Sequence, residues 1–168
     1  MKNKWSDDKA SEFINKYANQ WGEDMALRVY TSRLIGSEKE LVLHGGGNTS
    51  VKSTFTNIFG DKIPAIFVKA SGHDLASIEP EGHTGLDLDY LQKMQFLPDL
   101  DDDSMVNELL THRFDIKADN PSIETLTHAF IPYKYIDHTH ADSILALSNQ
   151  PNGKEIIHEA LGKDIVIL

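Results

Sequence analysis

The sequence predicts a single α/β domain in which helices cover a mixed or antiparallel sheet. Amphipathic helical segments alternate with short apolar runs of strand character, so both kinds of element belong to one domain. The alternation lacks the regular strand–helix–strand repeat that a parallel sheet requires. In addition, 168 residues with 40% hydrophobic and 25% charged side chains have the size and composition of one globular domain.

Two helices are expected at the start of the chain. Ser6 and the two aspartates that follow it form a helix start, with an N-cap and acidic residues in the first turn. Apolar residues then recur at helical spacing, namely Phe13, Ile14, Tyr17 and Trp21. A second helix is predicted over residues 23–34, and it stops near Gly36.

The middle of the chain is predicted to form short strands and a long loop. Residues 41–43, 51–56 and 63–68 are apolar runs separated by glycine-containing turns, which is typical of strands. Residues 70–86 contain three glycines, Pro80 and scattered charges, a composition that favours an irregular loop. Loops of this kind often carry functional residues.

The rest of the chain is predicted to be mainly helical. The expected helices cover residues 87–96, 104–114, 123–130, 141–147 and 153–161, and the expected strands cover residues 135–140 and 164–168. The acidic run 99–103 is interpreted as the solvated entrance of a helix. Because the chain ends inside an apolar run, we expect the domain, assigned to residues 1–168, to be incomplete and to continue beyond Leu168.

Composition excludes several classes of function. Aspartate and glutamate (26) outnumber lysine and arginine (16), and the net charge of −10 has the wrong sign for binding nucleic-acid phosphates. No apolar stretch approaches the ~20 residues that span a bilayer, and the first residues have no signal-peptide pattern. We therefore expect a cytoplasmic protein that binds neither nucleic acid nor a membrane. Because the sequence has no cysteine, a metal site would be built from His, Asp and Glu.

The motif Asp137-His138-Thr139-His140 is the most specific local signal. Residues two apart share one face of a strand, so His138 and His140 have the spacing needed to bind one metal ion. The alternative is a pair of half-exposed surface histidines. Asp137 or Asp142 is a candidate for orienting a ligand histidine. The third ligand stays open among histidines elsewhere in the chain, which are His44, His73, His83 and His128.

Three further segments have residues suited to binding a phosphate. The glycines of Gly45-Gly46-Gly47-Asn48 let backbone N–H groups approach an anion, although such a turn can also be purely structural. It has neither the ending of a P-loop nor the serine elbow that accompanies a lipase oxyanion loop. Lys69-Ala70-Ser71-Gly72 brings a cation and a hydroxyl to a strand end.

The last of these segments is Pro121-Ser122-Ile123-Glu124. It places a hydroxyl at the expected N-terminus of a helix, which is a position that favours anions. Glu124 follows in the first turn, where a carboxylate commonly balances the helix dipole. Beside a metal ion, the same carboxylate is a candidate general base.

Taken in order, these four motifs resemble the class II aldolase/adducin family, the zinc-dependent sugar-phosphate aldolases. Residues 73–82 and 121–142 are similar to the aldolase domain of bifunctional rhamnulose-1-phosphate aldolase/short-chain dehydrogenase proteins. The resemblance implies a three-layer α/β/α fold around a mostly antiparallel sheet. It also implies a homo-oligomer, commonly a tetramer, with sites near the subunit interfaces.

The resemblance also implies roles for individual residues. Those expected to bind the substrate phosphate are Gly47, Asn48, Ser71, Gly72 and Ser122. Glu124 would be the catalytic acid/base, and His138 and His140 would be two of three ligands of Zn²⁺. The implied reaction is cleavage of a ketose 1-phosphate, similar to rhamnulose 1-phosphate, into dihydroxyacetone phosphate and an aldehyde.

The sequence departs from the family pattern at two places. Ile123 stands where many relatives have a second serine. The family's third zinc histidine is followed by glycine, whereas His158, the one histidine after His140, precedes Glu159. Two alternatives therefore stay open. One is a sugar-phosphate epimerase or dehydratase on the same scaffold, and the other is a non-catalytic adducin-like module or a truncated remnant.

Overall fold

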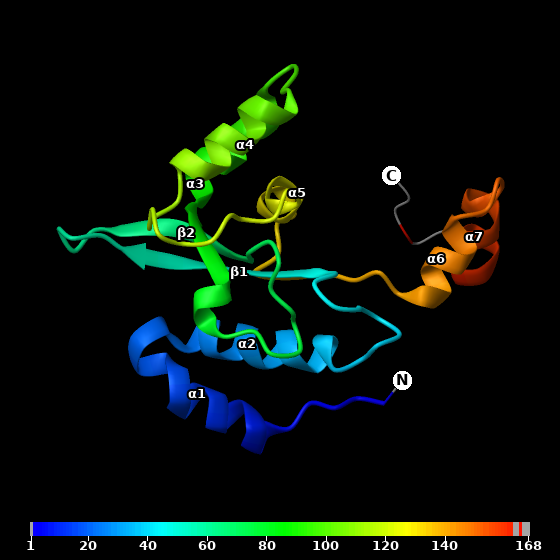
Figure 1. The fold of residues 1–168 in the computed structure, drawn as a ribbon, viewed down its shortest axis with the longest axis horizontal. Coiled ribbons are helices and arrows are strands. Elements are labelled where there is room, and N and C mark those ends of the chain that lie inside the picture. The colour runs from blue at the N-terminus through cyan, green and yellow to red at the C-terminus, as the bar shows by residue number, and fades with distance from the viewer. Residues whose placement is uncertain (1, 163–164, 166–168) are drawn as a thin grey trace.

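The structure is a three-layer α/β/α domain around a four-stranded antiparallel sheet, as the family resemblance implies (Figure 1). The computed structural model describes residues 2–162 and 165. The strands, in the spatial order β3-β2-β1-β4, are β1 (Asn48–Thr56), β2 (Lys62–Lys69), β3 (His83–Asp87) and β4 (Tyr135–His138). The helices are α1 (Asp7–Trp21), α2 (Glu23–Gly36), α3 (Leu88–Lys93), α4 (Asp102–Thr111), α5 (Thr125–Phe130), α6 (Asp142–Ser148) and α7 (Gly153–Leu161).

Helices α1 and α2 cover one face of the sheet. Ser6 caps α1, because its hydroxyl accepts a hydrogen bond from the Lys9 N–H at 3.4 Å. Apolar side chains from both helices meet β1 and β2 in one cluster, which includes Tyr17, Met25, Ala26, Val29, Val51 and Phe67. Burial of this apolar surface is the main force that holds the two helices on the sheet.

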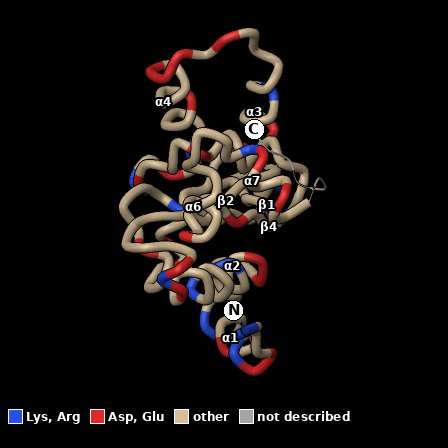
Figure 2. Tube along the Cα trace, turned by 90° about the vertical axis from the view of Figure 1, so that its right-hand side faces the viewer, with Lys and Arg blue, Asp and Glu red and all other residues tan. Residues whose placement is uncertain are grey.

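Helices α3 and α5 cover the opposite face, and α4 projects from this layer (Figure 1). The core on this side includes Ile66, Val68, Leu86, Leu91 and Ala129. Asp101 caps α4 by accepting a hydrogen bond from the Ser104 N–H at 2.9 Å, so the acidic run is a helix entrance, as predicted. The acidic first turns of α1 and α4 lie at opposite ends of the molecule (Figure 2).

Strand β1 organises the sheet because it pairs with β2 on one side and with β4 on the other. Side chains alternate along it, so Ser50 faces α5 while Val51 faces α1 and α2. At the beginning of β1, Asn48 lies opposite His138 of β4. This register places the glycine-rich turn before β1 next to the histidine motif.

Arg28 of α2 ties this part of the sheet together from within the core. Its side chain is 1% exposed, and it forms an ion pair with Asp137 of β4 at 2.6 Å. The guanidinium group also donates to the backbone carbonyls of Ser50 in β1 and Ile136 in β4, at 3.1 and 3.4 Å. One buried cation therefore joins α2 to β1 and to β4, the strand that ends at His138.

The structure differs from the sequence-based predictions in the region before β1. Residues 41–43, predicted as a strand, form the end of a turn and irregular backbone, and the N–H groups of Leu41 and Val42 both donate to the Glu38 carbonyl. The predicted long loop ends in a strand that sequence patterns miss. That strand, β3, pairs with β2, although its sequence His-Thr-Gly-Leu-Asp has no clear apolar alternation.

Two differences concern the later part of the chain. Helix α5 begins at Thr125, so Ser122 and Glu124 precede the helix and do not occupy its first turn. The predicted strand 164–168 lies outside the described residues apart from Ile165. Helices α6 and α7 pack against each other beside the sheet (Figure 1). None of the described helices is both long and apolar enough to cross a membrane.

Arg28→Leu tests the role of the buried cation. We expect the free energy of unfolding to fall by about 3 kcal/mol, because Asp137 and two strand carbonyls lose their partner in or near the core. Asp137 keeps access to water, which places the loss at the lower end of the range for buried pairs. Urea unfolding measures this change in the free energy of unfolding. The exposed Lys39→Leu is the control, with an expected change within about 0.5 kcal/mol. Equal losses in both variants would contradict this role.

Candidate functional site

A pocket of 270 Å³ opens where β1 begins and β2 ends, and we name it the glycine-turn pocket. The residues that line it are Gly45, Gly46, Gly47, Asn48, Lys69, Ser71, Gly72, Ser122, Ile123, Glu124 and His140. Every residue expected to bind the phosphate is among them, together with the expected acid/base and one expected metal ligand. The other, His138, lies beside the pocket, with its Nδ1 atom 4.0 Å from Oε1 of Glu124. The fold thus brings together four motifs that are far apart in sequence.

The glycine turn needs glycine at position 47. The φ angle of Gly47 is +70°, which L side chains rarely adopt. A Cβ atom there would lie 2.8 Å from the His138 carbonyl oxygen and 2.6 Å from Cγ1 of Val42. The turn therefore passes directly against the end of β4, and its backbone is packed into a defined shape before any ligand arrives.

Lys69 holds two walls of the pocket together. Its side chain is buried, and the ammonium group donates to the carbonyls of Gly45 at 3.0 Å and His73 at 2.9 Å. Burial lowers the pKa of Lys69, while the nearby Glu124 carboxylate opposes that shift. Lys69 thus links the glycine turn to the 70–73 loop and places a positive charge behind both segments.

The Ser71–Gly72 segment is aligned with the segment that carries Ser122. Ala70 forms an isolated antiparallel bridge with Pro121, and the Ser71 N–H donates to the Asn120 carbonyl at 2.9 Å. Gly72 follows with a φ angle of +84°. The pairing places two hydroxyl groups, from distant parts of the chain, on the wall of one pocket.

Glu124 has a defined partner and is ionised at neutral pH. The Ser122 hydroxyl donates to Oε2 of Glu124, and the Glu124 N–H lies 3.3 Å from the same hydroxyl oxygen. Burial alone would raise the pKa of Glu124, but hydrogen bonds, chiefly from Ser122, and the nearby His138 lower it below its ordinary value. The carboxylate is available as a proton acceptor.

His138 and His140 lie side by side, although β4 ends at His138 and the predicted strand 135–140 is therefore two residues too long. Their ring centroids are 4.8 Å apart with 60° between the ring planes. Burial and the adjacent His140 lower the pKa of His138, which keeps its imidazole in the neutral form that binds metals. The backbone N–H of His140 donates to the Leu41 carbonyl at 2.9 Å, which fixes the main chain at this residue. Two neighbouring imidazoles of this kind could provide two ligands for a metal ion.

The other candidate histidines lie elsewhere. Within the described part of the chain, there is no group of three His, Asp or Glu side chains that could hold a metal ion. His44 is exposed, and Nε2 of His73 lies 2.8 Å from Oδ2 of Asp119. His83 and His128 are buried beside hydroxyl groups of β1, and burial lowers the pKa of His128 to about 4.

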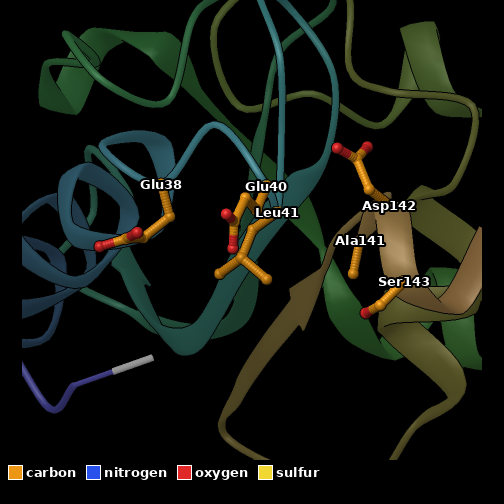
Figure 3. A pocket seen from close by; sticks show the side chains of 6 residues that line it. All are labelled: Glu38, Glu40, Leu41, Ala141, Asp142 and Ser143. Atoms are coloured by element: carbon orange, nitrogen blue, oxygen red, sulfur yellow. The ribbon is translucent and has the colours of Figure 1, made fainter.

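The aspartates next to the histidine motif do not orient its imidazoles. Asp137 forms its ion pair with Arg28, so it stabilises the strand and is not a partner of a ligand histidine. Asp142 begins α6 and lines a different pocket of 480 Å³, together with Glu38 and Glu40 from the loop after α2 (Figure 3). The structure therefore does not support the predicted role of either aspartate in holding a ligand.

Comparisons with known proteins identify the family of the chain. Residues 26–167 match the family model of the Class II Aldolase and Adducin N-terminal domain. The chain is 42% identical over 138 residues to the protein named uncharacterized oxidoreductase YuxG of Bacillus subtilis (strain 168). That match covers 82% of this chain and 20% of the relative, so the chain spans about a fifth of the length of the curated relative it matches.

A solved structure shares the whole fold. It is the N-terminal class II aldolase domain of a conserved protein from Thermoplasma acidophilum, with 36% sequence identity and a TM-score of 0.84. The similarity covers 100% of this chain and 73% of that one. By its sequence and its fold, the chain belongs to the class II aldolase and adducin N-terminal domain family.

Proposed function

We propose that this domain is a zinc-dependent aldolase that cleaves a ketose 1-phosphate, similar to rhamnulose 1-phosphate, into dihydroxyacetone phosphate and an aldehyde. The observation that carries the proposal is the convergence of phosphate-binding groups, an ionised carboxylate and two adjacent imidazoles at one pocket. Such a pocket matches the three requirements of the reaction. These are an anchor for the phosphate, a group that moves a proton, and a ligand set for a metal ion.

The phosphate is proposed to bind between the glycine turn and the paired serine segments. Backbone N–H groups near Gly47 and Gly72 and the Ser71 hydroxyl are suitable donors, and Ser122 lines the same wall with its hydroxyl donated to Glu124. The buried charge of Lys69 adds a positive field behind these groups. Ile123 removes one hydroxyl found in many relatives, but it leaves the backbone N–H at that position.

His138 and His140 are proposed to hold Zn²⁺. When bound, zinc supplies a Lewis acid for the negative charge that develops on the substrate oxygens. A catalytic zinc site commonly has three protein ligands. We place the third ligand outside the described residues or on a second copy of the chain, which is consistent with an oligomer whose sites lie near subunit interfaces.

Glu124 is proposed to move the proton. In the condensation direction, its carboxylate removes a proton from the carbon beside the carbonyl of dihydroxyacetone phosphate. In the cleavage direction, the substrate hydroxyl that becomes the aldehyde loses its proton as the carbon–carbon bond breaks, and Glu124, which takes up a proton in exchange, delivers it to that same carbon. The lowered pKa of Glu124 keeps the carboxylate ionised, as the first role requires, and its hydrogen bond with Ser122 fixes the carboxylate in place.

Glu124→Gln tests this assignment. We expect turnover of rhamnulose 1-phosphate to fall at least about 100-fold, because the amide cannot accept or return the proton. Release of dihydroxyacetone phosphate, coupled to NADH oxidation, measures the rate, and zinc content is measured in parallel. Glu40→Gln is the matched control, since this exposed carboxylate lines the neighbouring acidic pocket. A Glu124→Gln protein with the wild-type rate would overturn the assignment.

Gly47→Ala tests the phosphate anchor separately from the chemistry. The added Cβ atom meets the His138 carbonyl and Val42, so the turn must shift, and binding of inorganic phosphate is expected to weaken at least about tenfold. Isothermal titration calorimetry measures the affinity. Gly60→Ala is the matched control, because Gly60 also has a positive φ of 87° but no atom within 4 Å of the added Cβ. Equal phosphate affinity in the two variants would argue against the anchor.

A further inference from the structure

A second cavity lies apart from the glycine-turn pocket and shares no lining residue with it. Its volume is 390 Å³, and it lies between the end of α1 and the loop that follows α4. We name it the aromatic cavity, after the four aromatic side chains that line it: Trp21, Phe55, Phe67 and Phe114. The proposed aldolase chemistry uses none of these residues.

The walls of the aromatic cavity are flat rings held in place by the sheet. Phe55 and Phe114 are stacked, with centroids 4.1 Å apart and 5° between the ring planes. Phe67 lies over Gly85 of β3, where a Cβ atom would come within 2.7 Å of the phenyl ring. All four aromatic residues are only partly buried. A partly open space of this volume with aromatic walls is typical of a small-molecule site.

The charges around the cavity are mainly negative. Three carboxylates and one lysine line it, namely Glu81, Asp115, Asp119 and Lys117. Asp119 is paired with His73, and Asp115 accepts a hydrogen bond from the backbone N–H of Lys117 at 2.8 Å. Glu81 is exposed and has no ion-pair partner within the described part of the chain. It is therefore free to pair with a positively charged ligand.

A buried histidine forms part of the cavity wall. His83 lines the cavity with 4% of its surface exposed, and its Nε2 atom lies 3.4 Å from the Thr49 hydroxyl. Its other nitrogen, Nδ1, is buried without a hydrogen-bond partner among the described residues. Burial lowers the pKa of His83 to about 3, so the ring is neutral at neutral pH. The neutral His83 ring therefore forms an uncharged part of the cavity wall.

We propose that the aromatic cavity binds a small organic cation, a protonated amine attached to a single aromatic ring. The ring of such a ligand packs against the phenyl groups, and its ammonium group lies over their faces and pairs with Glu81. The same negative surroundings disfavour sugar phosphates, so the ligand class differs from that of the glycine-turn pocket.

Benzylamine is the probe, and Trp21 is the reporter. The sequence has two tryptophans, so Trp5→Phe leaves Trp21 as the one source of tryptophan fluorescence. In this background, we expect benzylamine to change the fluorescence with saturation. Benzyl alcohol, which lacks the charge, is expected to bind about fivefold more weakly. Glu81→Gln and Phe114→Leu are each expected to weaken benzylamine binding about fivefold, by removing the charge and an aromatic face.

The control is Glu155→Gln on α7, which removes an exposed carboxylate outside the cavity and is expected to leave the affinity unchanged. Equal affinity for benzylamine and benzyl alcohol would overturn the proposal and indicate a purely apolar docking surface. The absence of saturation by about 10 mM benzylamine would also overturn it. If Phe114→Leu does not fold, the test relies on Glu81→Gln, because Glu81 is exposed. Unchanged affinity in that variant counts against the proposal.

Discussion

The antiparallel pairing of β1 with β4 is the constraint on which the candidate site depends. It sets Asn48 opposite His138, so the glycine turn that precedes β1 lies against the strand that carries the histidines. A slip of one residue would turn every side chain of β4 to the other face of the sheet. The buried Arg28 opposes such a slip, because it contacts Asp137 and backbone carbonyls of both strands. The geometry of the site thus rests on a charge in the core.

Electrostatics divides the pocket into parts with different tasks. The Lys69 ammonium group donates to backbone carbonyls of two loops. It therefore holds these loops together and contributes a positive field from a fixed position. Glu124 stays ionised because hydrogen bonding to its carboxylate outweighs burial, whereas burial keeps the His138 imidazole neutral. An anionic proton acceptor and a neutral imidazole therefore occur side by side. This combination supports metal-assisted carbon–carbon bond cleavage better than a purely structural role.

Local patterns predict the fold and the site where the signal is carried by neighbours in sequence. Helix α1 is predictable because an N-cap and apolar spacing agree, and the four motifs are predictable because each has a distinct residue pattern. Strand β3 is not predictable from its own sequence pattern, because its pairing with β2 is what makes it a strand. Arg28 has only the weak signal of a cation among apolar residues of α2, and its partners are distant in sequence. Tertiary contacts alone define its role.

The most direct test of this account is an anomalous difference map at the zinc absorption edge, from crystals of the zinc-loaded protein. The account predicts a peak about 2.1 Å from an imidazole nitrogen of both His138 and His140, beside Glu124. A zinc peak confined to the acidic pocket of Glu38, Glu40 and Asp142 would contradict it. So would a map with no peak at the two histidines.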